Sequence, residues 1–170
     1  NLETTLLGRQ YRGYPHFCAP DSILDAMKSA GFNVVTTSNN HSFDTGWEGL
    51  ARTIDVVRSY GFHQTGTYKS AEDYQTPLII DANGVKVGVI AYTHGVNGRE
   101  RVVSGEQLSF CIRFIRNADY TRDIKALRDA GAEVVVAVMH WGSEYARTPS
   151  STIRAEAQKL AQAGVDVIFG

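Results

Sequence analysis

The sequence has few cysteines, no long apolar run and no excess of charge of one sign. Cys18 and Cys111 are the two cysteines among 170 residues, and they lack the close spacing of metal ligands. The two cysteines could form a single disulfide, could both be buried thiols, or could differ from each other in these respects. Buried or inert thiols are favoured.

The balance of charge argues against a nucleic-acid-binding surface. Lys and Arg number 17 against 18 Asp and Glu, which gives a net charge of -1, and no basic block stands out. No apolar stretch approaches the length that a bilayer requires, and the first residues are polar without the pattern of a signal peptide. The chain therefore shows no visible targeting signal.

What is present suits one globular domain. Hydrophobic residues make up 43% of the chain, enough for a sizeable core in a single domain over residues 1–170. The chain starts with Asn1 rather than Met and stops at Phe169-Gly170, directly after an apolar run. We therefore expect these residues to be an incomplete domain from a longer protein.

Four segments share one layout, a helical pattern that ends at a glycine and is followed by a short β-rich run. The glycines occupy the position where a helix C-terminus favours a left-handed residue. Helices that alternate with short apolar strands predict an α/β fold with a mostly parallel sheet whose strands are covered on both faces. The four pairs are residues 21–30 and 32–37, 49–60 and 62–67, 120–130 and 132–139, and 151–163 and 165–169.

Two segments depart from this layout. Residues 78–81 and 85–93 flank Ala82-Asn83-Gly84, which predicts a β-hairpin and the one antiparallel element of the sheet. Residues 94–117 follow no single period and contain several glycines, so they form a long connection with room for a short helix. Such a connection could be a lid or rim of a functional site, or a surface excursion.

Polar side chains follow two of the predicted strands. Asn40 and His41 come after residues 32–37, and His140 comes after residues 134–139. Ligands of open α/β sheets bind beyond the carboxyl ends of the strands, and imidazole and amide groups suit transition-metal ions. Asn40 and His140 are therefore candidate ligands, while His41 could act as a general acid.

Other interpretations of these residues stay open. Asp44 could orient His41 or could cap the helix that follows, and capping is slightly favoured because Asx residues prefer that position. Each histidine alone would more often be a turn residue, but two at the same edge of a sheet favour a site. The sequence does not decide whether His94, which follows the hairpin, belongs to the site. No other candidate site residue is expected near His16 or His63.

These motifs resemble the CapA family of capsule-synthesis proteins, a branch of the calcineurin-like metallophosphatase superfamily named for poly-γ-glutamate capsule biosynthesis. The resemblance covers nearly the whole chain. Its specific parts are Asn39-Asn40-His41-x-x-Asp44-x-Gly46 and His140-Trp141-Gly142-x-Glu144-Tyr145, and Gly66 is supportive.

The resemblance implies a layered αβ(β)α fold and a two-metal site of the Mn, Fe or Zn type. In it Asn40 and His140 would be metal ligands, Glu3 a bridging or near-metal acid, and His41 the histidine near the leaving group. Such a site clamps a phosphoryl or related group and generates hydroxide at neutral pH.

Two features depart from the family pattern. Ser42 stands where the superfamily has an acidic residue after the histidine, so Asp44 would be a displaced orienting group. The Gly-Asp and His-x-His motifs do not occur within residues 1–170. We therefore expect these residues alone to bind metal weakly or not at all and to be inactive, and an exposed sheet edge to favour a homodimer.

The functional expectation is a protein of capsule or cell-envelope polymer biosynthesis with a metal-dependent, hydrolase-like site. Its partners would be an anionic polymer or phosphate-containing substrate and the membrane proteins of capsule synthesis, with no nucleic acid. The alternative is a non-catalytic component of a membrane-associated synthesis or export complex. Family resemblance also places the intact protein outside the cytoplasm, anchored to the membrane.

Overall fold

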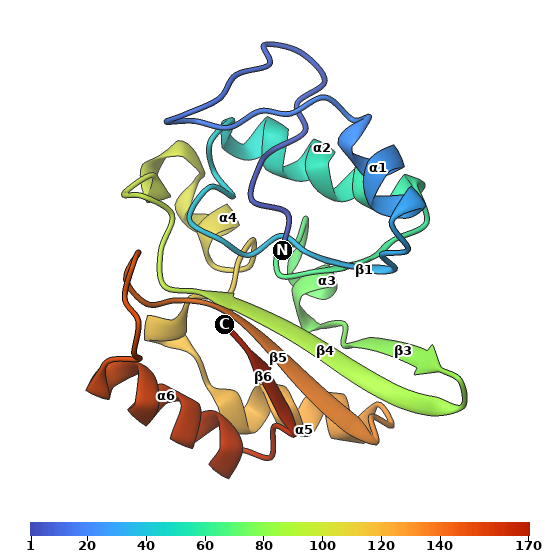
Figure 1. The fold of residues 1–170 in the computed structure, drawn as a ribbon, viewed down its shortest axis with the longest axis vertical. Helices are drawn as coiled ribbons and strands as arrows, with labels where there is room; N and C mark the ends of the chain where they lie inside the picture. Colours follow the sequence, from blue (N-terminus) through green and yellow to red (C-terminus); the bar gives the residue numbers. More distant parts are fainter.

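A computed structural model describes all residues 1–170 and arranges them in layers (Figure 1). Helices α1 and α2 cover a small sheet on one side, and α5 and α6 cover a larger sheet on the other. The helices are α1 (Ile23–Ser29), α2 (Gly46–Ser59), α3 (Ala71–Gln75), α4 (Gly105–Leu108), α5 (Tyr120–Asp129) and α6 (Ser151–Gln162). The strands are β1 (Val34–Thr36), β2 (His63–Thr65), β3 (Leu78–Ala82), β4 (Val85–Thr93), β5 (Val134–His140) and β6 (Val167–Phe169).

The strands form two sheets, as the layered fold implies. β1 and β2 pair in parallel, and the second sheet has the order β3-β4-β5-β6. Within it β4, β5 and β6 are parallel, whereas β3 and β4 form the antiparallel hairpin around Asn83 and Gly84. The α/β prediction with mostly parallel strands and one hairpin is confirmed.

The predicted helix ends are also confirmed. Gly31, Gly61, Gly131 and Gly164 follow α1, α2, α5 and α6, with φ between 83° and 97°. That left-handed conformation favours glycine because it has no Cβ. The irregular segment 94–117 contains the short helix α4 and the 3₁₀ turns Glu100–Val102 and Ile115–Asn117.

Buried apolar side chains gather on the helix-covered faces of the two sheets. On the larger sheet, Val135 and Ala137 of β5 pack with Ile124 and Leu127 of α5 and Leu160 of α6. On the smaller sheet, Val35 packs with Leu24 of α1 and Val57 of α2. A third cluster joins Leu50 and Ile54 of α2 to the segment 94–117.

The prediction that the apolar strands are covered on both faces is wrong for β5 and β6. Residues of β5 alternate between buried and half-buried, and Val167 and Phe169 of β6 are exposed. The less buried face lies along a cavity of about 670 Å³ between the sheets, lined by apolar side chains of both. The apolar runs predicted strands with both faces covered, but in the structure only the face toward α5 and α6 is covered, and the other face lines the cavity.

The two sheets approach each other closely at Gly66, which follows β2. A Cβ atom on Gly66 would lie 2.8 Å from the Ser38 backbone nitrogen and 3.2 Å from the Cβ of Ala91 on β4, and its φ is 103°. Both the close approach and the positive φ therefore require glycine.

The two cysteines are free and buried, as favoured from the sequence. Burial raises the pKa of the Cys111 thiol to about 12, which keeps it protonated and unreactive at neutral pH. None of the helices combines the length and apolar character needed to cross a membrane.

Candidate functional site

The carboxyl ends of β1 and β5 bring two predicted site residues together. Asn40 follows β1, His140 is the last residue of β5, and the Asn40 Oδ1 lies 2.9 Å from the His140 Nε2. The two strands belong to different sheets, so the site spans the gap between them. Their convergence agrees with the expectation that polar residues beyond the strand ends share one edge.

The first residues of the chain complete this cluster. The backbone N–H of Leu2 donates to the Thr36 carbonyl at 2.8 Å, which holds the N-terminal segment beside β1. This contact places the Glu3 Oε1 3.7 Å from the His140 Nε2 and the Asn1 Nδ2 3.4 Å from the His140 Nδ1. Glu3 thus lies beside His140, and its role as a near-metal acid stays a prediction.

His94, which the sequence left undecided, lies directly against His140. The two rings stack with centroids 5.7 Å apart and an angle of 16° between planes. The His94 backbone N–H donates to the His140 carbonyl at 2.9 Å, because β4 and β5 are paired neighbours. His94 therefore lines the cluster, and its place at the end of the hairpin strand was the signal for it.

The surroundings of His140 favour its neutral form. Burial lowers the pKa of the imidazole, and the nearby His94 and His41 lower it further, while Glu3 acts in the opposite direction. A neutral imidazole offers a lone pair, which is the form that binds a metal ion.

His41 is held by Asp44 and by an aromatic ring. The His41 Nδ1 lies 2.7 Å from the Asp44 Oδ2, and the Phe17 ring centroid lies 4.4 Å from that of His41. Because an ionised carboxylate only accepts hydrogen bonds, this pairing places the proton on Nδ1 and leaves Nε2 for exchange with a substrate.

The favoured capping role of Asp44 is wrong. Helix α2 begins at Gly46 with Thr45 in the N-cap position, and neither side chain caps it. The Asp44 Oδ2 instead accepts hydrogen bonds from His41 and from the Phe17 backbone N–H at 2.6 Å. The turn between His41 and Asp44 directs the carboxylate toward the His41 ring. The alternative prediction, that Asp44 orients His41, is therefore the one that remains.

Two loops border the site with residues that sequence reasoning missed. The Arg12 guanidinium donates to the Asp44 carbonyl at 2.9 Å, and the Arg99 Nε donates to the Phe43 carbonyl at 3.1 Å. The Asn97 Oδ1 accepts from the Asn40 Nδ2 at 3.3 Å. The segment 94–117 thus forms part of the rim, but loop arginines carry no periodic signal that could have identified them.

The donor chemistry fits part of the shell of one divalent ion. Glu3, Asn40 and His140 supply a carboxylate oxygen, an amide oxygen and an imidazole nitrogen near one point, a mixed set that suits Mn, Fe or Zn. No cluster of three or more His, Cys, Asp and Glu side chains forms a metal site.

The second motif, after His140, contributes less than the first. Trp141 is half-buried against the core of the larger sheet, but Glu144 and Tyr145 are exposed on the loop that follows. Neither joins the ligand cluster of Glu3, Asn40 and His140.

Comparison with known proteins gives consistent relatives. The chain is 27% identical to a "Capsule biosynthesis protein CapA" of Bacillus anthracis, over 91% of the chain and 38% of the relative. It is 26% identical to the "PGA biosynthesis protein CapA" of Bacillus subtilis, over 85% of the chain and 37% of the relative.

A "Probable polyglutamine synthesis accessory protein" of Mycobacterium tuberculosis is 27% identical, over the whole chain and 47% of the relative. The chain thus spans less than half the length of the curated relatives it matches. The family model of "Bacterial capsule synthesis protein PGA_cap" matches residues 1–170. The chain accordingly belongs to this bacterial capsule synthesis family.

Proposed function

We propose that this protein takes part in the biosynthesis of an anionic capsule polymer such as poly-γ-glutamate, through a metal-dependent, hydrolase-like site at the ends of β1 and β5. One observation carries the proposal, the convergence of Asn40 and His140 from two different sheets at 2.9 Å. Family membership supports the capsule role, and the geometry of the cluster supports the chemistry.

The role proposed for each residue is supported by its contacts. Glu3, Asn40 and His140 would hold a divalent ion with their oxygen and nitrogen donors. A bound ion lowers the pKa of its water, which supplies a nucleophile near neutral pH. In its doubly protonated form, with the Nδ1–H held by Asp44, His41 would give its Nε2 proton to the leaving group and return to the neutral Nδ1–H tautomer.

A second candidate function is a non-catalytic component of a polymer synthesis or export assembly. The small donor set favours it, because no cluster of three His, Cys, Asp or Glu side chains is present. A relative named as an accessory protein is consistent with it. In this case the membrane proteins of capsule synthesis would be its partners, and the strand-end residues would hold the fold or a ligand.

Substitution of His41 by Ala in the protein of full natural length separates the two functions. A catalyst should keep its circular dichroism spectrum and thermal midpoint but lose hydrolysis of a chromogenic phosphodiester, by about 100-fold or more. Capsule polymer formed by cells that carry the variant should fall in parallel. Unchanged polymer formation would favour the non-catalytic role.

Metal content provides an independent measurement. His140→Ala should lower the metal bound per protein in mass spectrometric analysis of the purified protein, because it removes the imidazole donor. His63→Ala is a matched control, since His63 is exposed on β2 and its side chain has no partner. Equal metal content in both variants would contradict the proposed site.

We also propose an extracytoplasmic, membrane-anchored location for the intact protein, on family resemblance alone. Protease treatment of whole cells should then degrade the protein while a cytoplasmic marker survives. Protection equal to that of the marker would contradict this location.

A further inference from the structure

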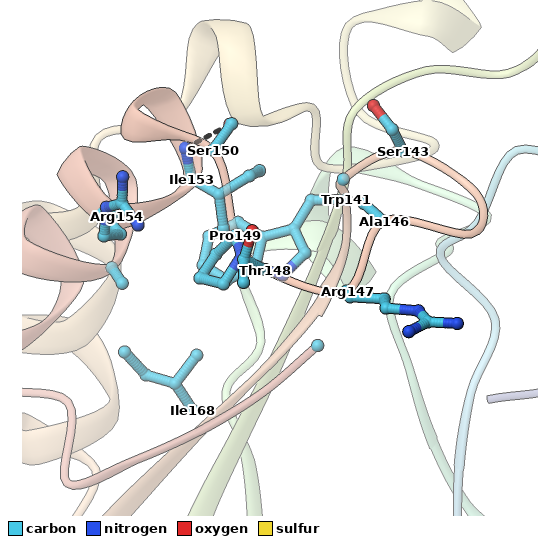
Figure 2. A pocket seen from close by; sticks show the side chains of 13 residues that line it. Trp141, Ser143, Ala146, Arg147, Thr148, Pro149, Ser150, Ile153, Arg154 and Ile168 are labelled. Atoms are coloured by element: carbon cyan, nitrogen blue, oxygen red, sulfur yellow. Dashed lines mark hydrogen bonds between the residues drawn. The ribbon is translucent and has the colours of Figure 1, made fainter.

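A pocket of about 490 Å³ lies beside the candidate site, at the carboxyl ends of β5 and β6 (Figure 2). Its walls come from the loop that leaves β5, from the first turns of α6 and from the end of β6. Trp141, which directly follows His140, is part of the wall. A residue of the pocket wall is therefore the direct neighbour in sequence of the candidate ligand His140.

The lining of this pocket is positively charged. Arg147 and Arg154 both line it, and no acidic residue does. Neither guanidinium takes part in a hydrogen bond or ion pair within the protein, although most other arginines of the chain do. Two unpaired guanidinium groups in one concave surface of a chain with net charge -1 indicate an anionic ligand.

Hydroxyl groups and the start of a helix add to this character. Ser143, Thr148 and Ser150 line the same pocket. The Ser150 hydroxyl accepts from the Ile153 N–H at 3.2 Å and so caps α6, the 12-residue helix whose positive end faces the pocket.

The arrangement suits a chain with repeated charges better than one small ion. In Figure 2 Arg154 lies on α6 at one side and Arg147 extends from the loop at the other, with Trp141, Thr148 and Pro149 between them. Carboxylates on successive units of a polymer could each meet one guanidinium fork. The Trp141 ring and Pro149 offer an apolar surface for the methylene groups between them.

We infer that this pocket binds a segment of a carboxylate-bearing polyanion, of which γ-linked polyglutamate is the simplest example, and positions it next to His140. The inference rests on the proposed function for the nature of the polymer. It adds a binding site, formed by Arg147, Arg154 and Trp141, that is separate from the metal ligands.

Titration of the full-length protein with a γ-linked glutamate decamer tests the inference. Tryptophan fluorescence should change on binding because Trp141 lines the pocket, and calorimetry should give the same affinity. The double variant Arg147→Gln/Arg154→Gln should bind at least about tenfold more weakly, since each charged hydrogen bond contributes substantially. Trp141→Phe should lose the fluorescence change while Trp47 remains.

A matched variant controls for the loss of positive charge. Arg101→Gln/Lys86→Gln removes two exposed cations whose side chains have no hydrogen-bond or ion-pair partner and lie outside the pocket. It should bind the decamer within about twofold of the unmodified protein. Equal weakening in both double variants would overturn the inference, because it would show a diffuse charge effect.

Two further ligands identify the chemistry that the pocket recognises. The amidated decamer, which has the same backbone without charge, should not bind, and inorganic phosphate should not displace the acidic decamer at equal concentration. Binding of the amidated decamer, or efficient displacement by phosphate, would overturn the inference. His140→Ala should retain decamer binding, so a failed metal site and a failed polymer pocket give different results.

Discussion

The Asp44 carboxylate connects two parts of the chain at the candidate site, its own turn and the loop that contains Phe17. Its Oδ2 accepts from the His41 ring and from the Phe17 backbone, and the side chain is 0% exposed. Its Oδ1 is buried without a hydrogen-bond partner. An unpaired buried oxygen lowers the stability of the fold, so its retention suggests that the carboxylate has another role. The carboxylate therefore fixes the His41 ring and the loop over it at the same time.

Replacement of Asp44 by Asn should reduce activity more than it reduces stability. An Asn side chain is uncharged, so its oxygen in the place of Oδ2 would accept the His41 and Phe17 hydrogen bonds without the assistance of a negative charge. We expect a fall of about 10–100-fold in turnover and a loss of about 1–3 kcal/mol in unfolding free energy. Phosphodiester kinetics as a function of pH and urea unfolding measure the two effects.

Asp25→Asn is the control, since the Asp25 side chain has no partner in the protein. A pH profile of Asp44→Asn identical to that of the unmodified protein would show that Asp44 is only structural.

At this scale the sequence predicted some contacts and not others. The meeting of Asn40 with His140 followed from the rule that strand ends share one edge. The use of Asp44 did not, because a cap and an orienting group require the same residue type just before a helix. Phe17, Asn97 and Arg12 come from irregular loops, whose course depends on tertiary contacts rather than on local pattern.

Among the elements, the extended segment 111–114 joins the two sheets. The Tyr68 N–H donates to the Cys111 carbonyl at 3.0 Å, and the Thr93 N–H donates to the Arg113 carbonyl at 3.0 Å. The Arg113 side chain also pairs with Asp123 of α5 at 3.0 Å and lies over the Tyr74 ring at 3.8 Å. This segment thus ties β4, α5 and the loop after β2 together.

Replacement of Arg113 by Met should destabilise the protein strongly. It leaves the buried Asp123 carboxylate without its buried ion-pair partner, at a cost of about 3 kcal/mol. Arg122→Met is a matched control, because Arg122 binds the same carboxylate but is 61% exposed, and such pairs contribute at most about 1 kcal/mol. Urea unfolding measures both, and equal losses would show that burial of the pair is not decisive.

The elements themselves were largely predictable. Glycine after α1, α2, α5 and α6 and the Asn-Gly hairpin predicted the ends of these elements within a few residues, because these positions have steric requirements that few residues meet. The coverage of β5 was not predictable, since an apolar run does not reveal whether side chains or a cavity lie on its second face. β1 and β2 are also shorter than the predicted ranges 32–37 and 62–67.

Over the whole molecule, the Asp166 carboxylate links the strand and helix layers of the larger sheet. Its Oδ2 accepts from the Val135 N–H of β5 at 2.7 Å and from Arg128 of α5 at 2.7 Å. The Val135 hydrogen bond is the largest cause that lowers the pKa of this carboxyl below its ordinary value of 3.8. Burial acts in the opposite direction, and the Arg128 guanidinium lowers the pKa further.

This shift predicts a pH dependence of stability. A group with a lowered pKa in the folded state stabilises the fold above its unfolded pKa, near 3.8, and this contribution is lost as the pH falls through the folded pKa. Asp166→Asn should therefore be less stable than the unmodified protein at pH 7, by under about 1 kcal/mol because the site is exposed. The difference should shrink below pH 3.8.

Thermal unfolding between neutral pH and about pH 2.5, near the lower end of carboxyl titration, measures this difference. Asp25→Asn should show no comparable change with pH. A destabilisation by Asp166→Asn that stays constant over the whole range would contradict the assigned ionic contribution.

The family resemblance predicted the order of the layers. Composition and periodicity alone predicted only the α/β class. Residues 1–170 alone are expected to hold metal weakly, and dimerisation through an edge strand stays a prediction.

The glycine at position 66 allows the two sheets to approach closely, because it has no side chain. Asn40 and His41 lie in the turn that follows β1 of the smaller sheet, and His140 ends β5 of the larger sheet. The distance between the sheets at the candidate ligands therefore depends on the absence of a side chain at Gly66. A methyl group there would act as a spacer, and it could weaken the alignment of Asn40 with His140 without touching either side chain.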